Sequence, residues 1–189
     1  MKRVGVLALQ GDFEAHERAL ARAGAEAVEV RSAADLENID ALIIPGGESS
    51  TMWKLLEEEK LLNPLRDFGR QRPIFGTCAG AILLASQVDN PPQPSLGLID
   101  MEVERNAYGR QLDSRIARLH PENGMEGGDM EAVFIRAPII RRVGGDAHVL
   151  ARYQGDPVLV EQGRHLAATF HPELTEDSRV HLMFLRKIP

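Results

Sequence analysis

Four short apolar segments, separated by helical patterns, dominate the first half of the chain and constrain its fold more than any other feature. They are RVGVLAL (3–9), AEAVEVR (25–31), ALIIPGG (41–47) and PIFGT (73–77). The first is rich in aliphatic residues without alternation, as in a strand that is buried on both faces. Helical patterns cover 12–24, 49–59, 61–71 and 79–87. Alternating strands and helices predict a parallel sheet with helices on both faces.

After residue 88 the pattern changes to short segments that are typical of antiparallel strands. A Pro-rich connection (88–97) leads into alternating segments at 98–106 and 110–119. The Gly-rich, acidic segment 120–131 is expected to be a surface loop, and 177–188 suits a closing helix. We therefore expect an α/β fold with three layers. A mixed, mostly parallel sheet is flanked by helices and carries an antiparallel extension. The 189 residues, without a repeat, suit one domain over 1–189.

Charge and cysteine content narrow the class of protein. The formal net charge of −6 and the pI of about 5.5 argue against a nucleic-acid-binding protein. No segment approaches the roughly 20 apolar residues that span a bilayer. The short N-terminal apolar run ends in Gly and Asp, unlike a secretory signal. The single cysteine excludes an intramolecular disulfide and fits a reducing compartment. We expect a soluble, cytoplasmic protein that binds neither nucleic acid nor membrane.

The only cysteine, Cys78, lies in GTCAG (76–80), where an expected strand meets an expected helix. Gly-x-Cys-x-Gly has the form of the nucleophile elbow Gly-x-Ser-x-Gly, a sharp turn that needs small residues around its nucleophile. The turn would put the thiol at a helix N-terminus, where the dipole and free N–H groups stabilise a thiolate. Those N–H groups, that of Ala79 among them, can hold a developing oxyanion. A lone cysteine is most often a small buried hydrophobe, but this setting predicts a nucleophile.

A nucleophilic cysteine needs a base, and the base needs an orienting group. His171 ends the apolar run 166–170 and precedes Pro172, which halts a strand. Glu173, two residues further on, can reach the second ring nitrogen of His171. None of the other five histidines needs a special role. His16, on a helix among charged neighbours, is expected to be solvated.

The third candidate element is PGGESST (45–51), which follows an expected strand and starts an expected helix. Ser49 or Ser50 can cap that helix. The two glycines before it let the backbone approach a ligand or flip a peptide. The N–H of Gly47 can complete an oxyanion hole, and Glu48 can hold the ammonium group of a ligand.

Together these residues resemble the class I, triad-type glutamine amidotransferases and, more narrowly, the glutaminase subunits of pyridoxal 5′-phosphate synthase. The resemblance covers essentially the whole chain, through GVLALQGDFEAH (5–16), LIIPGGESSTM (42–52), IFGTCAG (74–80), VERNAYGRQLDS (103–114), VFIRAP (133–138) and FHPELTED (170–177). GGESSTM, RNAYGRQ and HPELTED are specific to that subfamily. The resemblance implies a flavodoxin-like arrangement of the sheet, with no metal and no cofactor.

The resemblance also implies a chemistry. Cys78 attacks the side-chain amide of L-glutamine, His171 protonates the departing ammonia and then activates water, and Glu173 orients His171. The oxyanion is assigned to the N–H groups of Gly47 and Ala79. Substrate binding is assigned to Gly47, Glu48, Ser49, Arg105, Ile135 and Arg136. An arginine suits the carboxylate of glutamine because a guanidinium can bind it in bidentate fashion.

A partner is implied as well. Ammonia is volatile and is protonated in water, so glutaminases of this kind dock on a synthase that receives the ammonia through a tunnel. The expected partner is the (β/α)8-barrel subunit of pyridoxal 5′-phosphate synthase, in a 12:12 assembly. Gln10, at the end of the first strand, is expected to contact the synthase and to help form the active oxyanion geometry.

Three other interpretations stay open. The first is another triad amidotransferase, serving histidine or nucleotide synthesis, which RNAYGRQ and HPELTED disfavour. The second is a non-catalytic regulatory subunit of the same fold, which would lack a triad residue, whereas all three are present. The third is a cysteine hydrolase or peptidase of related architecture, a class that usually has a different histidine context.

Overall fold

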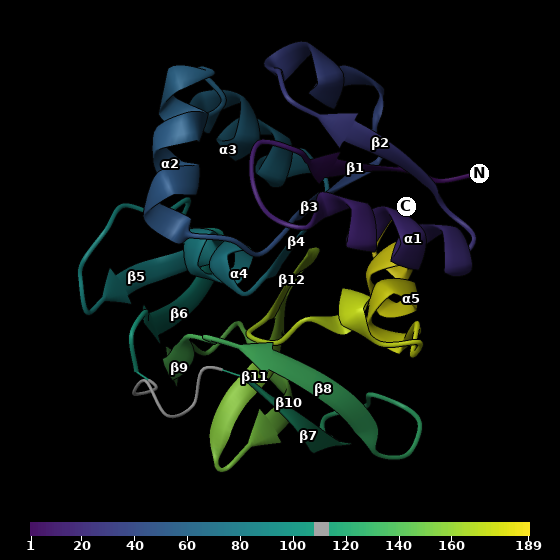
Figure 1. Ribbon diagram of the computed structural model, residues 1–189, viewed down its shortest axis with the longest axis vertical. Coiled ribbons are helices and arrows are strands. Elements are labelled where there is room, and N and C mark those ends of the chain that lie inside the picture. Colours follow the sequence, from purple (N-terminus) through teal and green to yellow (C-terminus); the bar gives the residue numbers. More distant parts are fainter. Residues whose placement is uncertain (108–113) are drawn as a thin grey trace.

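The computed structural model describes residues 1–107 and 114–189 of the chain (Figure 1). The strands are β1 (Arg3–Leu7), β2 (Glu26–Val30), β3 (Ala41–Ile44), β4 (Ile74–Thr77), β5 (Ala85–Asp89), β6 (Ile99–Glu104), β7 (Ser114–Pro121), β8 (Met130–Ile135), β9 (Ile139–Val143), β10 (His148–Tyr153), β11 (Asp156–Gln162) and β12 (His165–Ala168). The helices are α1 (Phe13–Arg22), α2 (Ser49–Glu58), α3 (Leu62–Gln71), α4 (Ala79–Leu84) and α5 (Arg179–Arg186), with the 3-10 helices η1 (Ala33–Asn38) and η3 (Pro172–Leu174). Within the described residues, one sheet has the order β2-β1-β3-β4-β12-β11-β10-β7-β8 and a second has the order β5-β6-β9.

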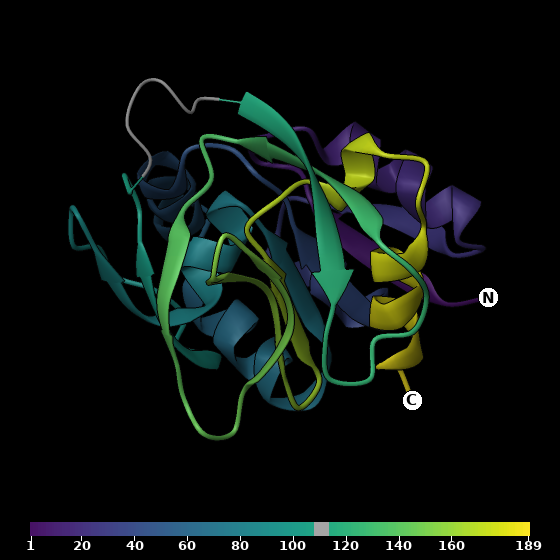
Figure 2. The same cartoon turned by 90° about the horizontal axis from the view of Figure 1, so that it is seen from below.

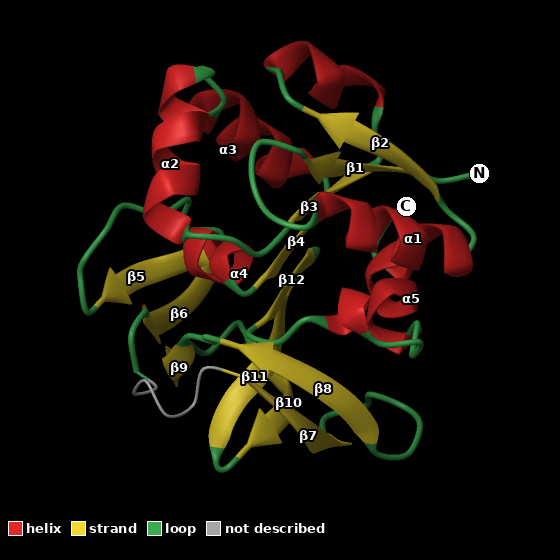
Figure 3. Cartoon of the chain, in the orientation of Figure 1, coloured by secondary structure: helices red, strands yellow, loops and turns green. Residues whose placement is uncertain are grey.

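The neighbouring strands β2, β1, β3, β4 and β12 pair in parallel and form the middle layer of the molecule. Successive side chains of a strand point to opposite faces. Leu42 and Ile44 of β3 therefore join the core that contains α2 and α3, whereas Ile43 joins the core that contains α1 and α5. Figure 3 shows α2, α3 and α4 on one side of these strands and α1 and α5 on the other. The expected α/β fold is confirmed.

Strands β11, β10, β7 and β8 extend the sheet through antiparallel pairs. Figure 2 views the molecule from the side of this extension, which is drawn in green. Burial alternates along β7, where Ala117 and Leu119 are buried and Ile116 is 70% exposed. One face of β7 and β8 is thus open, and these two strands need apolar residues only at every second position, whereas β10 and β11 are each buried over three successive residues.

One expected helix boundary is different in the structure, and one expected strand start is not tested. The helix expected over 79–87 ends at Leu84 and is followed by β5, which covers the start of the expected Pro-rich connection. The reason is that Leu96 N–H donates to Leu83 O at 2.7 Å and Leu98 N–H donates to Leu84 O at 3.0 Å, so other amides satisfy the last carbonyls of the helix. The strand expected over 110–119 is found from Ser114, and its first four residues lie outside the described ranges.

Candidate active site

The turn between β4 and α4 holds Cys78 in a backbone conformation that few residues adopt. Its φ is 52° and its ψ is −108°. A positive φ of this kind strains a non-glycine residue by about 1–3 kcal/mol. Neighbouring backbone fixes the turn, since Cys78 N–H donates to Ala168 O on β12 at 2.8 Å. The sulfur therefore lies at the carboxyl end of β4, in the sharp turn that Gly-x-Cys-x-Gly predicts.

The two glycines of this motif allow an approach of backbones that no side chain would permit. A Cβ on Gly80 would lie 2.0 Å from the carbonyl oxygen of Ile44, at the end of β3. A Cβ on Gly76 would lie 2.4 Å from the carbonyl oxygen of Gly80. Both distances are far inside van der Waals contact. Helix α4 can thus pack directly against β3 and β4, and this packing holds the turn at Cys78.

His171 and Glu173 reach the elbow because β12 is the neighbour of β4 in the sheet. Gly46 lies between the base and the nucleophile: a Cβ there would be 2.7 Å from His171 Cε1 and 3.4 Å from Cys78 Cβ. The distance from His171 Nδ1 to Glu173 Oε1 is 2.6 Å. An ionised carboxylate only accepts hydrogen bonds, so Nδ1 carries a hydrogen and is the donor in this bond. The other ring nitrogen of His171, Nε2, is then the one that can interact with the thiol of Cys78. The structure brings the three expected triad residues together.

The surroundings of His171 favour its protonated form. Burial lowers the pKa of His171, but the hydrogen bonds to Cys78 and Glu173 and the charges of both outweigh it and raise the pKa to about 10. Burial alone would raise the pKa of the Glu173 carboxyl. His16 and the hydrogen bond to His171 outweigh burial and hold this pKa below its ordinary value. An imidazolium between a carboxylate and a sulfur is the charge arrangement that suits a cysteine nucleophile.

A cavity of about 330 Å³ opens in front of the thiol. It is lined by Gly47, Glu48, Ser49, Cys78, Ala79, Ile82, Arg105, Asn106 and Arg136. Five of the six residues expected to bind substrate are thus in its wall. The sixth, Ile135, enters the site through its backbone, because its carbonyl oxygen accepts from Cys78 Sγ at 3.7 Å. Ile82 and Asn106 are additions that the sequence motifs did not single out, although Asn106 follows Arg105 directly.

The Glu48 carboxylate accepts hydrogen bonds both from the first turn of α2 and from Arg105. Its carboxylate accepts from Thr51 N–H at 2.7 Å and from Ser50 N–H at 3.3 Å, so Glu48 caps α2 and the expectation of a Ser49 or Ser50 cap was wrong. Arg105 Nη2 donates to it at 2.9 Å. Although burial acts the other way, hydrogen bonds from the side chains and backbone N–H groups of Ser50 and Thr51 lower the pKa of Glu48 to about 2. The cavity wall therefore presents one anion, Glu48, and two cations, Arg105 and Arg136, which complement the two charged groups of an amino acid.

Gln10 ties the end of β1 to the peptide that precedes α2. Its side-chain oxygen accepts from Glu48 N–H at 2.8 Å. Gly47 has a φ of 144°, and a Cβ there would lie 2.7 Å from that oxygen, so both the backbone conformation and the space require glycine. The expected roles of Gly47 and Ala79 in an oxyanion hole, and of Gln10 in partner contact, stay predictions.

The expectation for His16 was wrong: this side chain is fully buried behind Glu173. Its Nε2 lies 3.3 Å from Glu173 Oε2 and 3.1 Å from Thr77 Oγ1. The charged neighbours of His16 in the sequence pointed to solvent. Its spacing pointed the other way, since His16, Ala19 and Leu20 stand at i, i+3 and i+4 and form the buried stripe of α1.

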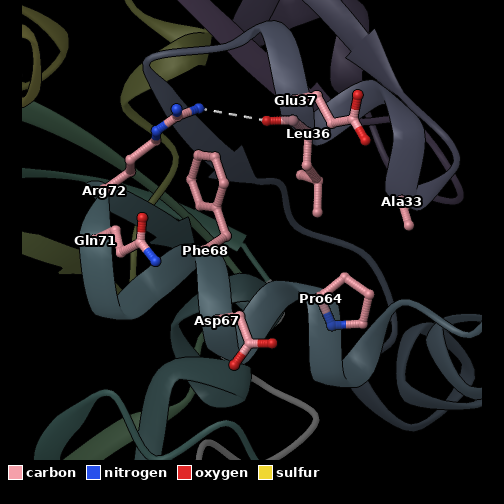
Figure 4. A pocket seen from close by; sticks show the side chains of 8 residues that line it. All are labelled: Ala33, Leu36, Glu37, Pro64, Asp67, Phe68, Gln71 and Arg72. Carbon is pink, nitrogen blue, oxygen red and sulfur yellow. Dashed lines mark hydrogen bonds between the residues drawn. The ribbon is translucent and has the colours of Figure 1, made fainter.

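A separate hollow between η1 and α3 is shown in Figure 4. Arg72 Nη1 donates to the carbonyl oxygens of Ile39 at 2.5 Å and Leu36 at 3.5 Å, and the guanidinium lies over the ring of Phe68. This arginine thus fastens the two elements to each other, and we assign the hollow no function. Within residues 1–107 and 114–189, no helix is long and apolar enough to cross a bilayer, and no group of three or more His, Cys, Asp or Glu residues is arranged to hold a metal ion.

Solved structures define the class to which this fold and site belong. A crystal structure of a glutamine amidotransferase is 51% identical to the chain, with a TM-score of 0.91 over 98% of each chain. The structure of PurLQS from Thermotoga maritima matches with a TM-score of 0.74 at 20% identity, a likeness of fold alone. The architecture is that of the glutamine amidotransferases.

The chain belongs to the SNO glutamine amidotransferase family, whose model matches residues 6–189. A relative named pyridoxal 5′-phosphate synthase subunit PdxT, from Solibacter usitatus (strain Ellin6076), is 62% identical over 100% of both chains. A relative of the same name from Koribacter versatilis (strain Ellin345) is 55% identical over 98% of this chain and 95% of its own. The family resemblance deduced from the sequence motifs is confirmed.

Proposed function

We propose that this amidotransferase hydrolyses L-glutamine to L-glutamate and ammonia with Cys78, His171 and Glu173 as its triad. One observation carries the proposal: the strained elbow at Cys78 opens into a cavity, and the His171–Glu173 pair lies beside it at an Nδ1–Oε1 distance of 2.6 Å. The complete triad argues against a non-catalytic subunit. Membership of the SNO family argues against a peptidase.

The reaction has two halves. The Cys78 sulfur attacks the side-chain carbonyl carbon of glutamine, and the electron pair of the C=O bond moves to oxygen. The tetrahedral intermediate collapses to a thioester as His171 gives a proton to the departing amine, which leaves as ammonia. His171 then takes a proton from water, and the hydroxide adds to the thioester carbon. Collapse of the second intermediate expels the thiolate and releases glutamate. Glu173 holds the protonated Nδ1 throughout.

The cavity wall supplies the rest of the proposed site. The carboxylate of glutamine binds Arg105 or Arg136 and its ammonium binds Glu48, while Gly47, Ser49 and Ile135 complete the substrate site. The oxyanion rests on the N–H group of Gly47, between β3 and α2, and on that of Ala79, at the N-terminus of α4. The charges of Glu48 and Arg105 in the wall of the cavity support this assignment.

The ammonia is passed to a partner in this proposal. The relatives are named as subunits of pyridoxal 5′-phosphate synthase, and we propose that this chain is the glutaminase subunit of such an enzyme. Its partner is the barrel subunit that makes pyridoxal 5′-phosphate, in a 12:12 assembly with Gln10 at the contact. Residues 1–189 form a single glutaminase domain that acts in the cytoplasm. The free thiol of Cys78, which a reducing compartment preserves, supports that location.

Glutamate release tests the proposal. The wild type and Cys78→Ala are each assayed alone and with a barrel synthase subunit from a related organism. We expect release that the synthase stimulates and that Cys78→Ala abolishes. Release without a response to the synthase would leave a free-standing glutaminase. No release while the subunits bind each other would refute the catalytic assignment.

A further inference from the structure

Behind the triad lie two histidines that the proposed mechanism does not use. His16 on α1 and His181 on α5 are both fully buried. His16 Nδ1 is 3.1 Å from His181 Nε2, and His16 Nε2 is 3.3 Å from Glu173 Oε2. The other carboxylate oxygen of Glu173, Oε1, is bound to His171 at 2.6 Å. One line of contacts therefore runs from the base through the triad carboxylate to α1 and α5.

Only one arrangement of protons suits these contacts. The two imidazoles share one hydrogen bond, so either His181 Nε2 or His16 Nδ1 donates in it. If His16 Nδ1 donated, the lone pair of its Nε2 would face the carboxylate of Glu173, and His181 Nδ1 would be a buried donor without a partner among the described residues. If His181 Nε2 donates, His16 Nε2–H bonds Thr77 Oγ1 at 3.1 Å and also faces Glu173 Oε2 at 3.3 Å, and His181 Nδ1 is merely an unused acceptor. The second arrangement turns an N–H toward the charged group, whose Oε2 has no hydrogen bond among the described residues, and it leaves no donor buried alone.

We propose that His16 is a positioning residue of the triad. Its tautomer is fixed by His181, so it presents Nε2–H to Glu173 Oε2 at 3.3 Å and holds the carboxylate in the orientation that serves His171. The inference rests on the proposed role of Glu173. It assigns a partner to a carboxylate oxygen that is buried, with a side-chain exposure of only 2%, and that has no hydrogen bond among the described residues but faces His16 Nε2 at 3.3 Å. Thr77 Oγ1, at 3.1 Å from the same ring nitrogen, keeps the imidazole beside β4.

Burial keeps both imidazoles neutral, and the charges around the pair act in both directions. Burial lowers the pKa of His16 most; the charge of His171 acts in the same direction, and those of Glu173 and Asp12 oppose it. Burial also lowers the pKa of His181 to about 3, with His16 and Arg22 in the same direction and Glu173 opposing. A neutral His16 offers one N–H without adding a charge to the triad, so it orients Glu173 while leaving the positive charge on His171.

Variants at His16 separate a positioning role from a structural one. His16→Leu removes the donor at similar apolar volume, whereas His16→Gln can place an amide N–H near the position of Nε2. His165→Leu is the matched control. His165 is also buried, and it accepts a backbone hydrogen bond from Ile74 at 3.1 Å, outside the active site. Each variant is assayed for glutamate release with the synthase subunit. The isolated chain is assayed for the pH dependence of Cys78 alkylation by iodoacetamide.

We expect His16→Leu to lower kcat by about 10- to 100-fold, the effect of removing the N–H that faces a buried charged group. KM for glutamine should change less than about twofold, because the cavity wall is untouched. The acid limb of the alkylation profile, which is the pH range over which the rate of Cys78 alkylation increases, should shift upward by about one pH unit. The reason is that the Glu173 carboxylate takes up a proton more readily when no N–H faces it. His16→Gln should restore most of both properties, and His165→Leu should change neither.

Two results with the His16 variants would overturn the proposal. One is a folded His16→Leu with wild-type kcat and an unmoved acid limb. The other is an equal loss of kcat in both His16 variants with no movement of the limb, which is the mark of a purely structural residue. If His16→Leu does not fold, His181→Leu takes its place. It should move the limb in the same direction, and a folded His181→Leu with an unmoved limb would also overturn the proposal. Should the wild type release no glutamate, the proposed function fails, while the alkylation profiles still decide on His16.

Discussion

Two carboxylates of this site, Glu48 and Glu173, are each paired with a cation, but their surroundings differ. The Glu48 side chain is 51% exposed and accepts from Arg105 at 2.9 Å. The Glu173 side chain is 2% exposed and accepts from His171 at 2.6 Å. Water and salt weaken the first pair and hardly reach the second. An exposed pair can therefore open to admit charged groups of a substrate, whereas a buried pair keeps one geometry.

This contrast extends to the residues around each carboxylate. The front wall of the site consists of Gly47, Glu48, Ser49, Arg105 and Arg136, which line the cavity. The back wall consists of Thr77, Glu173, His16 and His181, all of which are buried. In our account the front wall binds substrate and the back wall fixes the geometry of the base. Substitutions in the front wall should act mainly on KM, and substitutions in the back wall should act mainly on kcat.

The largest effect is expected from Glu173→Gln, which breaks the back wall. The amide removes the negative charge beside His171 and can present an N–H to Nδ1, which favours the wrong tautomer. We expect kcat for glutamine hydrolysis to fall by about 10³- to 10⁴-fold, with KM nearly unchanged. Steady-state kinetics with the synthase subunit check this. A fall confined to KM would reverse the assignment of the two walls.

The elbow that stands between the two walls is tested by Gly80→Ala. The new Cβ would lie 2.0 Å from Ile44 O, a backbone atom that cannot move aside alone. We expect a loss of about 3 kcal/mol or more in the free energy of unfolding, measured by urea denaturation. Gly145→Ala is the control, because a Cβ there meets nothing within 4 Å, and it should stay within about 0.5 kcal/mol of wild type. Equal stability of the two variants would mean that α4 is not packed as described.

A smaller effect is expected in the front wall, from Arg105→Ala. The variant removes the cation beside Glu48, so KM for glutamine should rise by about 10- to 100-fold while kcat changes little. Arg142→Ala is the matched control: this arginine pairs with Asp100 at 2.8 Å on the second sheet and is outside the cavity lining. A loss of kcat without a rise in KM would place Arg105 in the chemistry and not in binding.

The smallest effect is a dependence of stability on pH that the back wall should confer. Burial lowers the pKa of His181 from 6.5 to about 3. Its contribution to stability is therefore complete above pH 6.5 and is lost as the pH falls from there toward 3. We expect His181→Gln to lose about 1 kcal/mol less stability than wild type between about pH 6 and pH 5. His120→Gln, whose wild-type side chain is 80% exposed, should follow the wild-type curve in urea unfolding.

The sequence was most informative where a motif is local. Gly-x-Cys-x-Gly predicted the elbow because the constraint lies within five residues, and His-Pro-Glu predicted the His171–Glu173 hydrogen bond for the same reason. The alternation of strands and helices predicted the covered sheet, because a strand that is buried on both faces must be apolar throughout. These patterns also carried the family assignment.

The back wall could not be predicted, because its residues come together only through the sheet order. Thr77, His16 and His181 lie on β4, α1 and α5, and no spacing in the chain relates them. The end of α4 at Leu84 was missed for a similar reason, since amides at 96 and 98 take its last carbonyls. Glu48 as the cap of α2 was missed because serine is the more usual cap.

The central claim, that Cys78 is the nucleophile for glutamine, is tested most directly by covalent labelling. An electrophilic glutamine analogue, with a chloroketone in place of the amide, is incubated with the chain and the synthase subunit. Peptide mass spectrometry then locates the adduct. We predict one adduct, on Cys78, that forms in step with loss of glutaminase activity and is suppressed by excess glutamine. Complete inactivation with Cys78 unmodified would contradict the account.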